Sequence, residues 1–101
     1  MKGVPMTKTE LIAKLTTIKF ELQEQFGINQ IALFGSYAKD KATDDSDVDI
    51  AIIKADKKDY FLMLDAKKFI EDILQKKVDL GYFDSIRPFV KKRIQKDLIY
   101  V

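Results

Sequence analysis

Apolar residues near the start of the chain recur with the spacing of one helix face. Five of them follow one another at intervals of four, three, four and four residues: Leu11, Leu15, Ile18, Leu22 and Phe26. These intervals predict a single amphipathic helix. Thr7 and Glu10 have the spacing of a capping box at its start, with Thr9 as the alternative cap, and Gly27 stands where helices commonly end in a left-handed residue. Residues 1–6 (MKGVPM) precede this helix and are expected to form a loose leader.

Four later segments have the pattern of strands. Residues 31–34 (IALF) are a short apolar run, whereas residues 47–53 (DVDIAII) and 77–83 (KVDLGYF) alternate between apolar and polar or small positions. Residues 98–101 (LIYV) are expected to add a short edge strand. The polar, turn-rich residues 37–46 separate the first two strands, with one helical turn expected at their start.

A long helix is predicted between the second and third strands, over residues 59–76, with Asp59 as its N-cap. A charged turn at residues 55–58 precedes it. Six apolar residues are expected on its buried face: Leu62, Ala66, Phe69, Ile70, Ile73 and Leu74.

A last helix is predicted over residues 85–98, capped by Ser85 or Asp84, with Pro88 tolerated in its first turn. Its apolar side consists of Phe89, Val90 and Ile94. The element order is therefore helix, strand, turn, strand, helix, strand, helix, with a possible final strand. This order predicts an α/β or α+β fold, in which helices pack on one face of a small mixed β-sheet and the other face carries the aspartates of the strands.

The length of 101 residues fits one domain over residues 1–101. A domain of this size buries only about two thirds of its unfolded surface. We therefore expect an open site that a partner chain or a self-associated copy completes.

Composition removes several classes of chemistry. The chain has no Cys and no His, which excludes disulfides, thiolate nucleophiles, His-based zinc sites and His acid–base catalysis. The 18 basic residues, of which 16 are Lys, face 16 acidic ones for a net charge of +2, so binding to nucleic acid or membranes is not expected. The sequence has neither a membrane span nor a signal-peptide core, and we expect a cytoplasmic protein.

Three aspartates occupy matching positions in the two alternating strands. Asp47 and Asp49 project from the same face of their strand, and Asp79 has the same phase in the next strand pattern. If these strands pair, three carboxylates gather on one sheet face, where without a cation one would tend to protonate. Mg²⁺ suits such oxygen ligands, and two ions could hold the attacking and leaving oxygens of a phosphoryl displacement. With no His available, Asp79 is also the candidate general base.

A glycine-serine pair follows the first strand. Gly35 lets a phosphate approach the main chain, and Ser36, at the start of a helical turn, can donate its hydroxyl. Lys39, one turn further on, can add positive charge. The pair is not a Walker loop, because the chain contains no GK[ST] sequence.

The run GSYAKDKATDDSDVD, in which ten residues separate Gly-Ser from Asp-x-Asp, resembles the signature of the DNA polymerase β-like nucleotidyltransferases. Within them the chain looks most like the minimal nucleotidyltransferase (MNT) domains, commonly the antitoxins of HEPN–MNT toxin–antitoxin pairs. The resemblance spans residues 8–100 and includes Asp79 in the phrase KKVDL. It implies a palm-like fold, Mg²⁺, and transfer of AMP from ATP to a protein acceptor, often a tyrosine of the HEPN toxin.

The same resemblance places Gly35 and Ser36 at the triphosphate and Asp47, Asp49 and Asp79 at the metals. The family often reads Gly-Ser-x-Ala-Arg-Gly, whereas this chain has Lys39-Asp40. Lys keeps the charge but lacks the bidentate fork of Arg. This departure supports an alternative function, a binding antitoxin that neutralises its partner by covering it. Transfer of AMP to a small molecule such as an aminoglycoside is a further, weaker alternative.

The acidic segment has two other interpretations, a solvated turn and a calcium-binding loop. The stretch TDDSD by itself is typical of a solvated turn. Asp45, Asp47 and Asp49 fit the start of a calcium loop, but Ile50 stands where that loop requires glycine and Asp56 where it requires glutamate, which excludes it.

Overall fold

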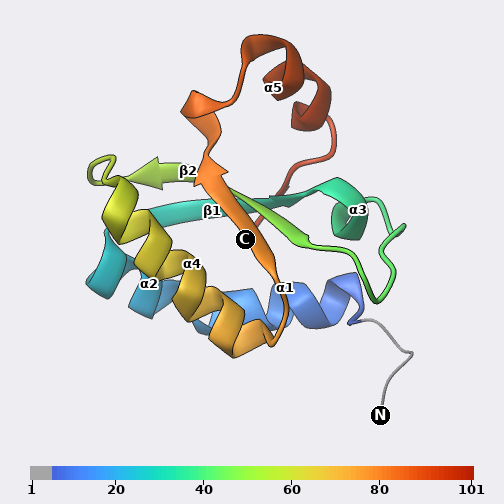
Figure 1. The fold of residues 1–101 in the computed structure, drawn as a ribbon, viewed down its shortest axis with the longest axis horizontal. Helices are drawn as coiled ribbons and strands as arrows, with labels where there is room; N and C mark the ends of the chain where they lie inside the picture. Colours follow the sequence, from blue (N-terminus) through green and yellow to red (C-terminus); the bar gives the residue numbers. More distant parts are fainter. Residues whose placement is uncertain (1–5) are drawn as a thin grey trace.

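A four-stranded mixed sheet with the strand order β3-β2-β1-β4 forms the centre of the molecule (Figure 1). The computed structural model describes residues 6–101. Its strands are β1 (Ile28–Phe34), β2 (Val48–Ala55), β3 (Val78–Tyr82) and β4 (Ile99–Tyr100). β1 pairs antiparallel with β2 and with β4, whereas β2 and β3 run parallel. The predicted strands, including the short edge strand, are confirmed, and β1 begins earlier than expected.

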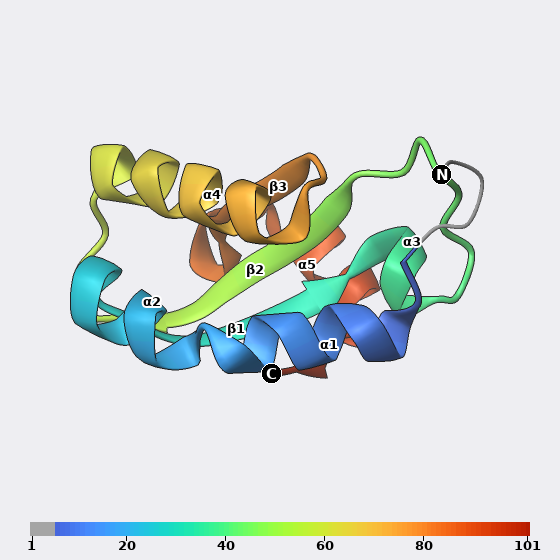
Figure 2. The same ribbon diagram turned by 90° about the horizontal axis from the view of Figure 1, so that it is seen from below.

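Three of the helices cover one face of this sheet, and α5 lies on the other side (Figures 1 and 2). The helices are α1 (Lys8–Thr17), α2 (Lys19–Phe26), α3 (Gly35–Ala38), α4 (Tyr60–Leu74) and α5 (Pro88–Gln95), with a 3₁₀ turn η1 (Phe83–Ser85). The buried apolar core lies between the sheet and α1, α2 and α4. Among residues 6–101 no helix is both long and apolar enough to span a membrane.

The start of α1 and the end of α2 follow the predicted capping signals. Thr7 and Glu10 form both hydrogen bonds of a capping box, and Gly27 ends α2 in the left-handed conformation with φ +65°. Of the predicted leader only Met6 lies within the described residues, where it packs partly against the core; residues 1–5 lie outside them.

The predicted single helix is broken at Ile18, so one expectation was wrong. Thr16 Oγ1 donates a hydrogen bond to the Ile12 carbonyl at 2.7 Å, and Thr17 Oγ1 donates one to the Lys14 carbonyl at 2.6 Å. Such threonine hydroxyls compete for the carbonyls of the helical ladder and bend helices. Ile18 nevertheless remains buried in the core, so the apolar stripe continues through the break.

The cap of α4 is confirmed, and its predicted buried face is confirmed in part, at Ala66, Ile70 and Leu74. Asp59 accepts a hydrogen bond from the Leu62 amide at 3.1 Å. The fully buried residues are Met63, Ala66, Ile70 and Leu74. Ile73 was expected inside and is instead 38% exposed. The helix ends at Gln75, which takes a left-handed φ of +56°, and therefore does not reach Lys76.

The prediction for the last helix was wrong about its cap and its bounds, since α5 spans Pro88–Gln95. Asp84 and Ser85 belong to η1, and Arg87 is the N-cap residue without a side-chain hydrogen bond. None of the residues of α5 is buried. The apolar spacing correctly indicated a helix, but spacing does not specify which surface will cover the apolar side.

Candidate active site

The predicted acidic residues meet where β2 and β3 pair. The parallel register places Asp49 directly opposite Asp79, so both side chains share one sheet face. Val48, Ile50 and Ile52 of β2 point into the core, and the aspartates therefore lie on the face turned away from the core helices. Asp47 comes immediately before β2 in the same phase.

The three carboxylates interact electrostatically, as like charges brought together should. Burial, followed by the negative charges of Asp79 and Asp47, raises the pKa of Asp49 from 3.8 to about 6. Asp49 is half-buried, whereas Asp47 and Asp79 are exposed. The ion pairs within residues 6–101 are Lys8–Asp40, Lys39–Asp97 and Lys91–Asp84. None of them involves a carboxylate of the cluster, so a bound cation could neutralise its negative charge.

Gly35 packs directly against the central carboxylate. The residue before it, Phe34, is the register partner of Asp49 in the antiparallel pair of β1 and β2. Gly35 itself adopts φ +76°, and a Cβ at this position would lie 2.9 Å from Asp49 Cγ and still closer to its carboxylate oxygen. Both the backbone conformation and the contact therefore require glycine. The glycine-serine turn and the acidic cluster therefore adjoin one another.

Gly35 and Ser36 are the first two residues of the four-residue helix α3. Ser36 is half-buried at its second position. Tyr37, at the start of the segment predicted to be polar and turn-rich, is only 2% exposed and anchors α3 in the core. Lys76 Nζ lies 5.9 Å from the centre of its ring. A buried aromatic thus fixes the turn beside the carboxylates.

Lys39, predicted to add positive charge near the phosphates, forms an ion pair with a residue that follows α5. Its Nζ is 3.7 Å from Asp97 Oδ2, just before β4, a partner that no local sequence signal indicated. A groove of about 380 Å³ lies here between the end of α3 and α5. Its lining residues are Lys39, Val90, Arg93, Ile94, Lys96 and Asp97. In this arrangement Lys39 joins α3 to the C-terminal side of α5.

Asp40, which departs from the glycine of the family pattern, takes a left-handed φ of +59°. Asp is among the few residues that tolerate this conformation. Its carboxylate lies 3.0 Å from Lys8 Nζ at the start of α1. Asp40 therefore replaces glycine in the backbone conformation that glycine favours, and Lys8 compensates its charge.

The acidic cluster is not a closed metal cage. No three acidic side chains within residues 6–101 are already arranged to enclose a metal ion. Mg²⁺, however, is usually held by one or two carboxylates together with waters and substrate phosphates. The donor set, which is purely carboxylate and carries unneutralised charge at Asp49, fits such a cation arriving with a nucleotide.

Comparison with known proteins agrees with this architecture. Residues 15–101 match the family model described as nucleotidyltransferase domain. MJ0126 of Methanocaldococcus jannaschii, provisionally named a protein adenylyltransferase, is 38% identical over 96 residues, covering 94% of this chain and 98% of the relative. Protein adenylyltransferase MntA of Thermococcus cleftensis is 32% identical over 96 residues, covering 95% and 97%.

Two solved structures share the fold. One, provisionally described as a minimal nucleotidyltransferase, gives a TM-score of 0.77 at 22% identity, over 96% of this chain and 98% of the other. A toxin–antitoxin crystal structure with AMP-PNP gives 0.71 at 24% identity, over 87% of this chain and 69% of the other. Both the sequence matches and the shared fold extend over nearly the whole chain. It follows that this chain belongs to the nucleotidyltransferase-domain family and is one of its MNT-like protein adenylyltransferases.

Proposed function

We propose that the chain transfers AMP from Mg²⁺-bound ATP to a tyrosine hydroxyl of a partner protein, a HEPN-type toxin, and that it does so in the cytoplasm. The observation that carries this proposal is the pairing of Asp49 with Asp79 next to Gly35. A structural neighbour supports the choice of acceptor, since its description is a tri-AMPylated Shewanella oneidensis HEPN toxin in complex with an MNT antitoxin, with a TM-score of 0.67.

Each predicted site residue has a distinct role in this reaction. Asp47, Asp49 and Asp79 hold the metal, and Gly35 and Ser36 bind the triphosphate through backbone N–H groups and the serine hydroxyl at the start of α3. When bound, Mg²⁺ neutralises charge on the phosphates and acidifies the attacking hydroxyl.

Lys39 needs a rearrangement before it can assist. Its ammonium group now pairs with Asp97, and an exposed pair of this kind stabilises the protein by about 0–1 kcal/mol. A triphosphate carries far more negative charge than a single carboxylate. We therefore expect Lys39 to exchange Asp97 for phosphate oxygens when ATP binds.

The chemical step uses the carboxylates because the chain has no His. The acceptor oxygen attacks the α-phosphorus of ATP, the bond from this phosphorus to the bridging oxygen breaks, and pyrophosphate leaves. The hydroxyl proton passes to Asp79, which is the exposed member of the Asp49–Asp79 pair and therefore the one that an acceptor can approach.

Transfer of label from radiolabelled ATP to the acceptor tests the role of the cluster. The double substitution Asp47→Asn and Asp49→Asn should abolish transfer while the circular dichroism spectrum stays that of the wild type. Asp44→Asn with Asp45→Asn is the matched control, because both residues are exposed in the preceding loop and the charge change is the same. Wild-type labelling by the first variant would show that the proposed site is wrong.

A second candidate is a binding antitoxin whose nucleotide site is vestigial. The departure from the family pattern at Lys39-Asp40 and the Lys39–Asp97 ion pair favour it. Calorimetric titration of ATP separates the two functions. An enzyme should bind ATP in a Mg²⁺-dependent manner, whereas a vestigial site should give no heat.

A further inference from the structure

The helix α5 lacks the apolar packing that supports the other long helices. Phe89 is 72% exposed and Val90 is 42% exposed, and none of the eight residues of α5 is buried. Isolated helices shorter than about 12 residues are marginal in water. The helix α4, in contrast, buries four side chains. An unsupported helix of this kind is stabilised when another surface covers it.

Ion pairs and a cation–π contact help to attach α5 and its flanking residues to the domain. Lys91 Nζ lies 3.6 Å from Asp84 Oδ1 and 4.8 Å from the centre of the Phe83 ring. At the other end, Lys39 reaches Asp97. Exposed ion pairs of this type contribute about 0–1 kcal/mol each, which is less than the burial of one large apolar side chain.

The charge of α5 restricts what can cover it. Residues 85–96 contain no acidic residue and five basic ones, which include both arginines of the chain: Arg87, Lys91, Lys92, Arg93 and Lys96. Because the whole chain carries only +2, the rest of it is net negative. A complementary partner is therefore acidic where it meets α5.

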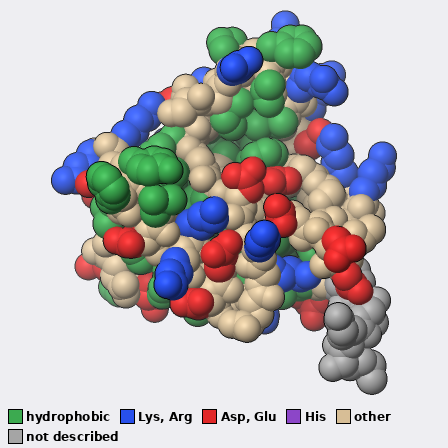
Figure 3. Space-filling view, in the orientation of Figure 1, with side chains coloured by type: hydrophobic (Ala, Val, Ile, Leu, Met, Phe, Trp, Pro, Cys, Tyr) green, Lys and Arg blue, Asp and Glu red, His purple; other side chains and the backbone are tan. Residues whose placement is uncertain are grey.

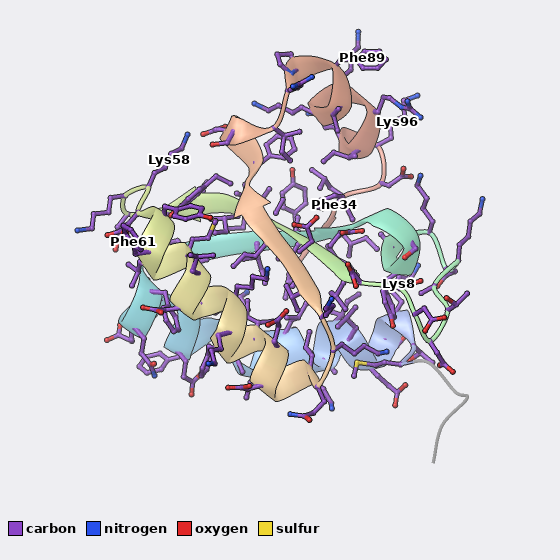
Figure 4. The ribbon with its side chains drawn as sticks, in the orientation of Figure 1. Lys8, Phe34, Lys58, Phe61, Phe89 and Lys96 are labelled. Carbon is purple, nitrogen blue, oxygen red and sulfur yellow. The ribbon has the colours of Figure 1, made fainter. Side chains whose placement is uncertain are left out.

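The outer side of α5 combines these charges with an apolar anchor. A hollow of about 190 Å³ is lined by Phe89, Lys92, Arg93 and Lys96, and the Arg93 guanidinium lies 5.9 Å from the centre of the Phe89 ring. Figure 4 shows Phe89 pointing away from the sheet, and Figure 3 shows basic side chains around apolar ones at this end of the molecule. An exposed aromatic side chain surrounded by basic residues can bind an acidic segment that also carries an apolar side chain.

The position of α5 connects this surface to the candidate site. The groove of about 380 Å³ runs between α5 and Lys39, at the end of the helix that begins with Gly35. Phe34, whose register partner is Asp49, lies between the sheet and α5 in Figure 4. A protein docked on α5 can therefore extend a tyrosine towards the carboxylates.

We propose that α5 is the docking surface for the acceptor, an acidic polypeptide whose apolar side chain covers Phe89. This inference rests on the proposed function, because it identifies the occupant as the molecule that receives AMP. A protein fits better than a nucleic acid, because the basic side chains here surround exposed Phe89 and Val90, which a partner protein can cover with apolar side chains of its own.

The test measures binding of fluorescently labelled poly(Glu,Tyr), an acidic tyrosine-containing polypeptide, by anisotropy in the absence of nucleotide. The wild type should bind it and should not bind poly(Lys,Tyr). The double substitution Phe89→Ala and Lys92→Glu should weaken binding at least about tenfold, because it removes the anchor and places like charges in contact. Lys92→Glu alone should weaken binding less, and it leaves the helix composition otherwise intact.

The matched control is Phe61→Ala with Lys68→Glu on α4, where Phe61 is also highly exposed (Figure 4). This control should bind like the wild type, within about twofold. Equal binding by the α5 variants and the wild type, or equal loss in the control, would overturn the inference. So would tighter binding of an RNA oligonucleotide that depends on Phe89 and Lys92.

Failure of this inference is distinguishable from failure of the proposed function. If binding depends on α5 but no AMP is transferred to any acceptor, the catalytic proposal falls and the docking surface stands. If AMP is transferred to poly(Glu,Tyr) with the same KM by the wild type and the α5 variants, the catalytic proposal stands and the docking surface falls.

Discussion

Asp49 is held in the folded protein at a cost in stability, and its replacement by Asn should reveal that cost. The pKa of Asp49 rises from 3.8 to about 6 on folding because of burial and the neighbouring carboxylates. The folded state therefore holds the proton more tightly than the unfolded state. The favourable contribution is fully present below the unfolded pKa and is lost as the pH rises through about 6. At neutral pH the charged carboxylate thus destabilises the metal-free protein.

The size of the effect follows from the shift. A change of about two pKa units corresponds to about 3 kcal/mol as an upper limit. Asp49 is only half-buried, and solvent screening reduces this value to about 1 kcal/mol. Asn has nearly the same shape without the charge. We therefore expect Asp49→Asn to raise the free energy of unfolding by about 1 kcal/mol at neutral pH, which corresponds to about 4–8 °C in Tm.

Thermal melting without metal, at neutral pH and near pH 4, measures this effect. The gain of Asp49→Asn should be present at neutral pH and should largely vanish near pH 4, where the wild-type carboxyl is protonated. Asp44→Asn, at an exposed position of the preceding loop, should show no gain at either pH. An Asn variant that melts below the wild type at neutral pH, or a gain that does not depend on pH, would refute the reasoning. Mg²⁺ with ATP should stabilise the wild type but not the variant.

Three further substitutions test the turn beside the cluster. Gly35→Ala should cost about 1–3 kcal/mol in urea unfolding and abolish AMP transfer, because the left-handed backbone is strained and the Cβ displaces Asp49; Gly81→Ala, where a Cβ meets nothing within 4 Å, is the control and should fold and transfer normally. Ser36→Ala should raise the KM for ATP by about tenfold at unchanged fold, since one hydrogen bond to a charged group is lost; an unchanged KM would remove Ser36 from the triphosphate site. Asp40→Gly should leave the KM for ATP within about twofold, because Lys8 already compensates this carboxylate; a large fall in KM would show that Asp40 repels the phosphates.

The sequence predicted the site best where the alternation of a strand alone determines the face on which a side chain lies. Alternation in β2 and β3 predicted that Asp49 and Asp79 share a face, because successive strand residues point to opposite sides. That the two strands are neighbours in parallel register is a property of the whole sheet, and the strand patterns could only suggest it. The contact between Gly35 and Asp49 was not predictable either, because it depends on the antiparallel register of β1 and β2.

The predictions were wrong where side-chain hydrogen bonds or tertiary contacts determine the local structure. The break at Ile18 depends on threonine hydroxyls that bond to carbonyls three and four residues earlier, and periodicity does not register such bonds. On α4, Met63 meets the core although it was not predicted to, whereas Ile73 is exposed. The pairing of Lys39 with Asp97 joins residues far apart in the chain. No local pattern contains that information.

Two features of the protein reduce its stability, and both lie on the side of the sheet away from the core. The negative charges of Asp79 and Asp47 disfavour the charged form of Asp49. On α5, the side chain of Phe89 is exposed to solvent. Local rules that fail in a natural protein tend to fail at functional sites. A divalent cation with its nucleotide relieves the first penalty, and a docked acidic acceptor relieves the second. Lys39, a candidate phosphate ligand, lines one groove together with Arg93 and Lys96, which also line the hollow at Phe89. Binding of either ligand should therefore order residues that the other ligand needs, and the acceptor should bind more tightly when Mg²⁺ and a non-hydrolysable ATP analogue are present.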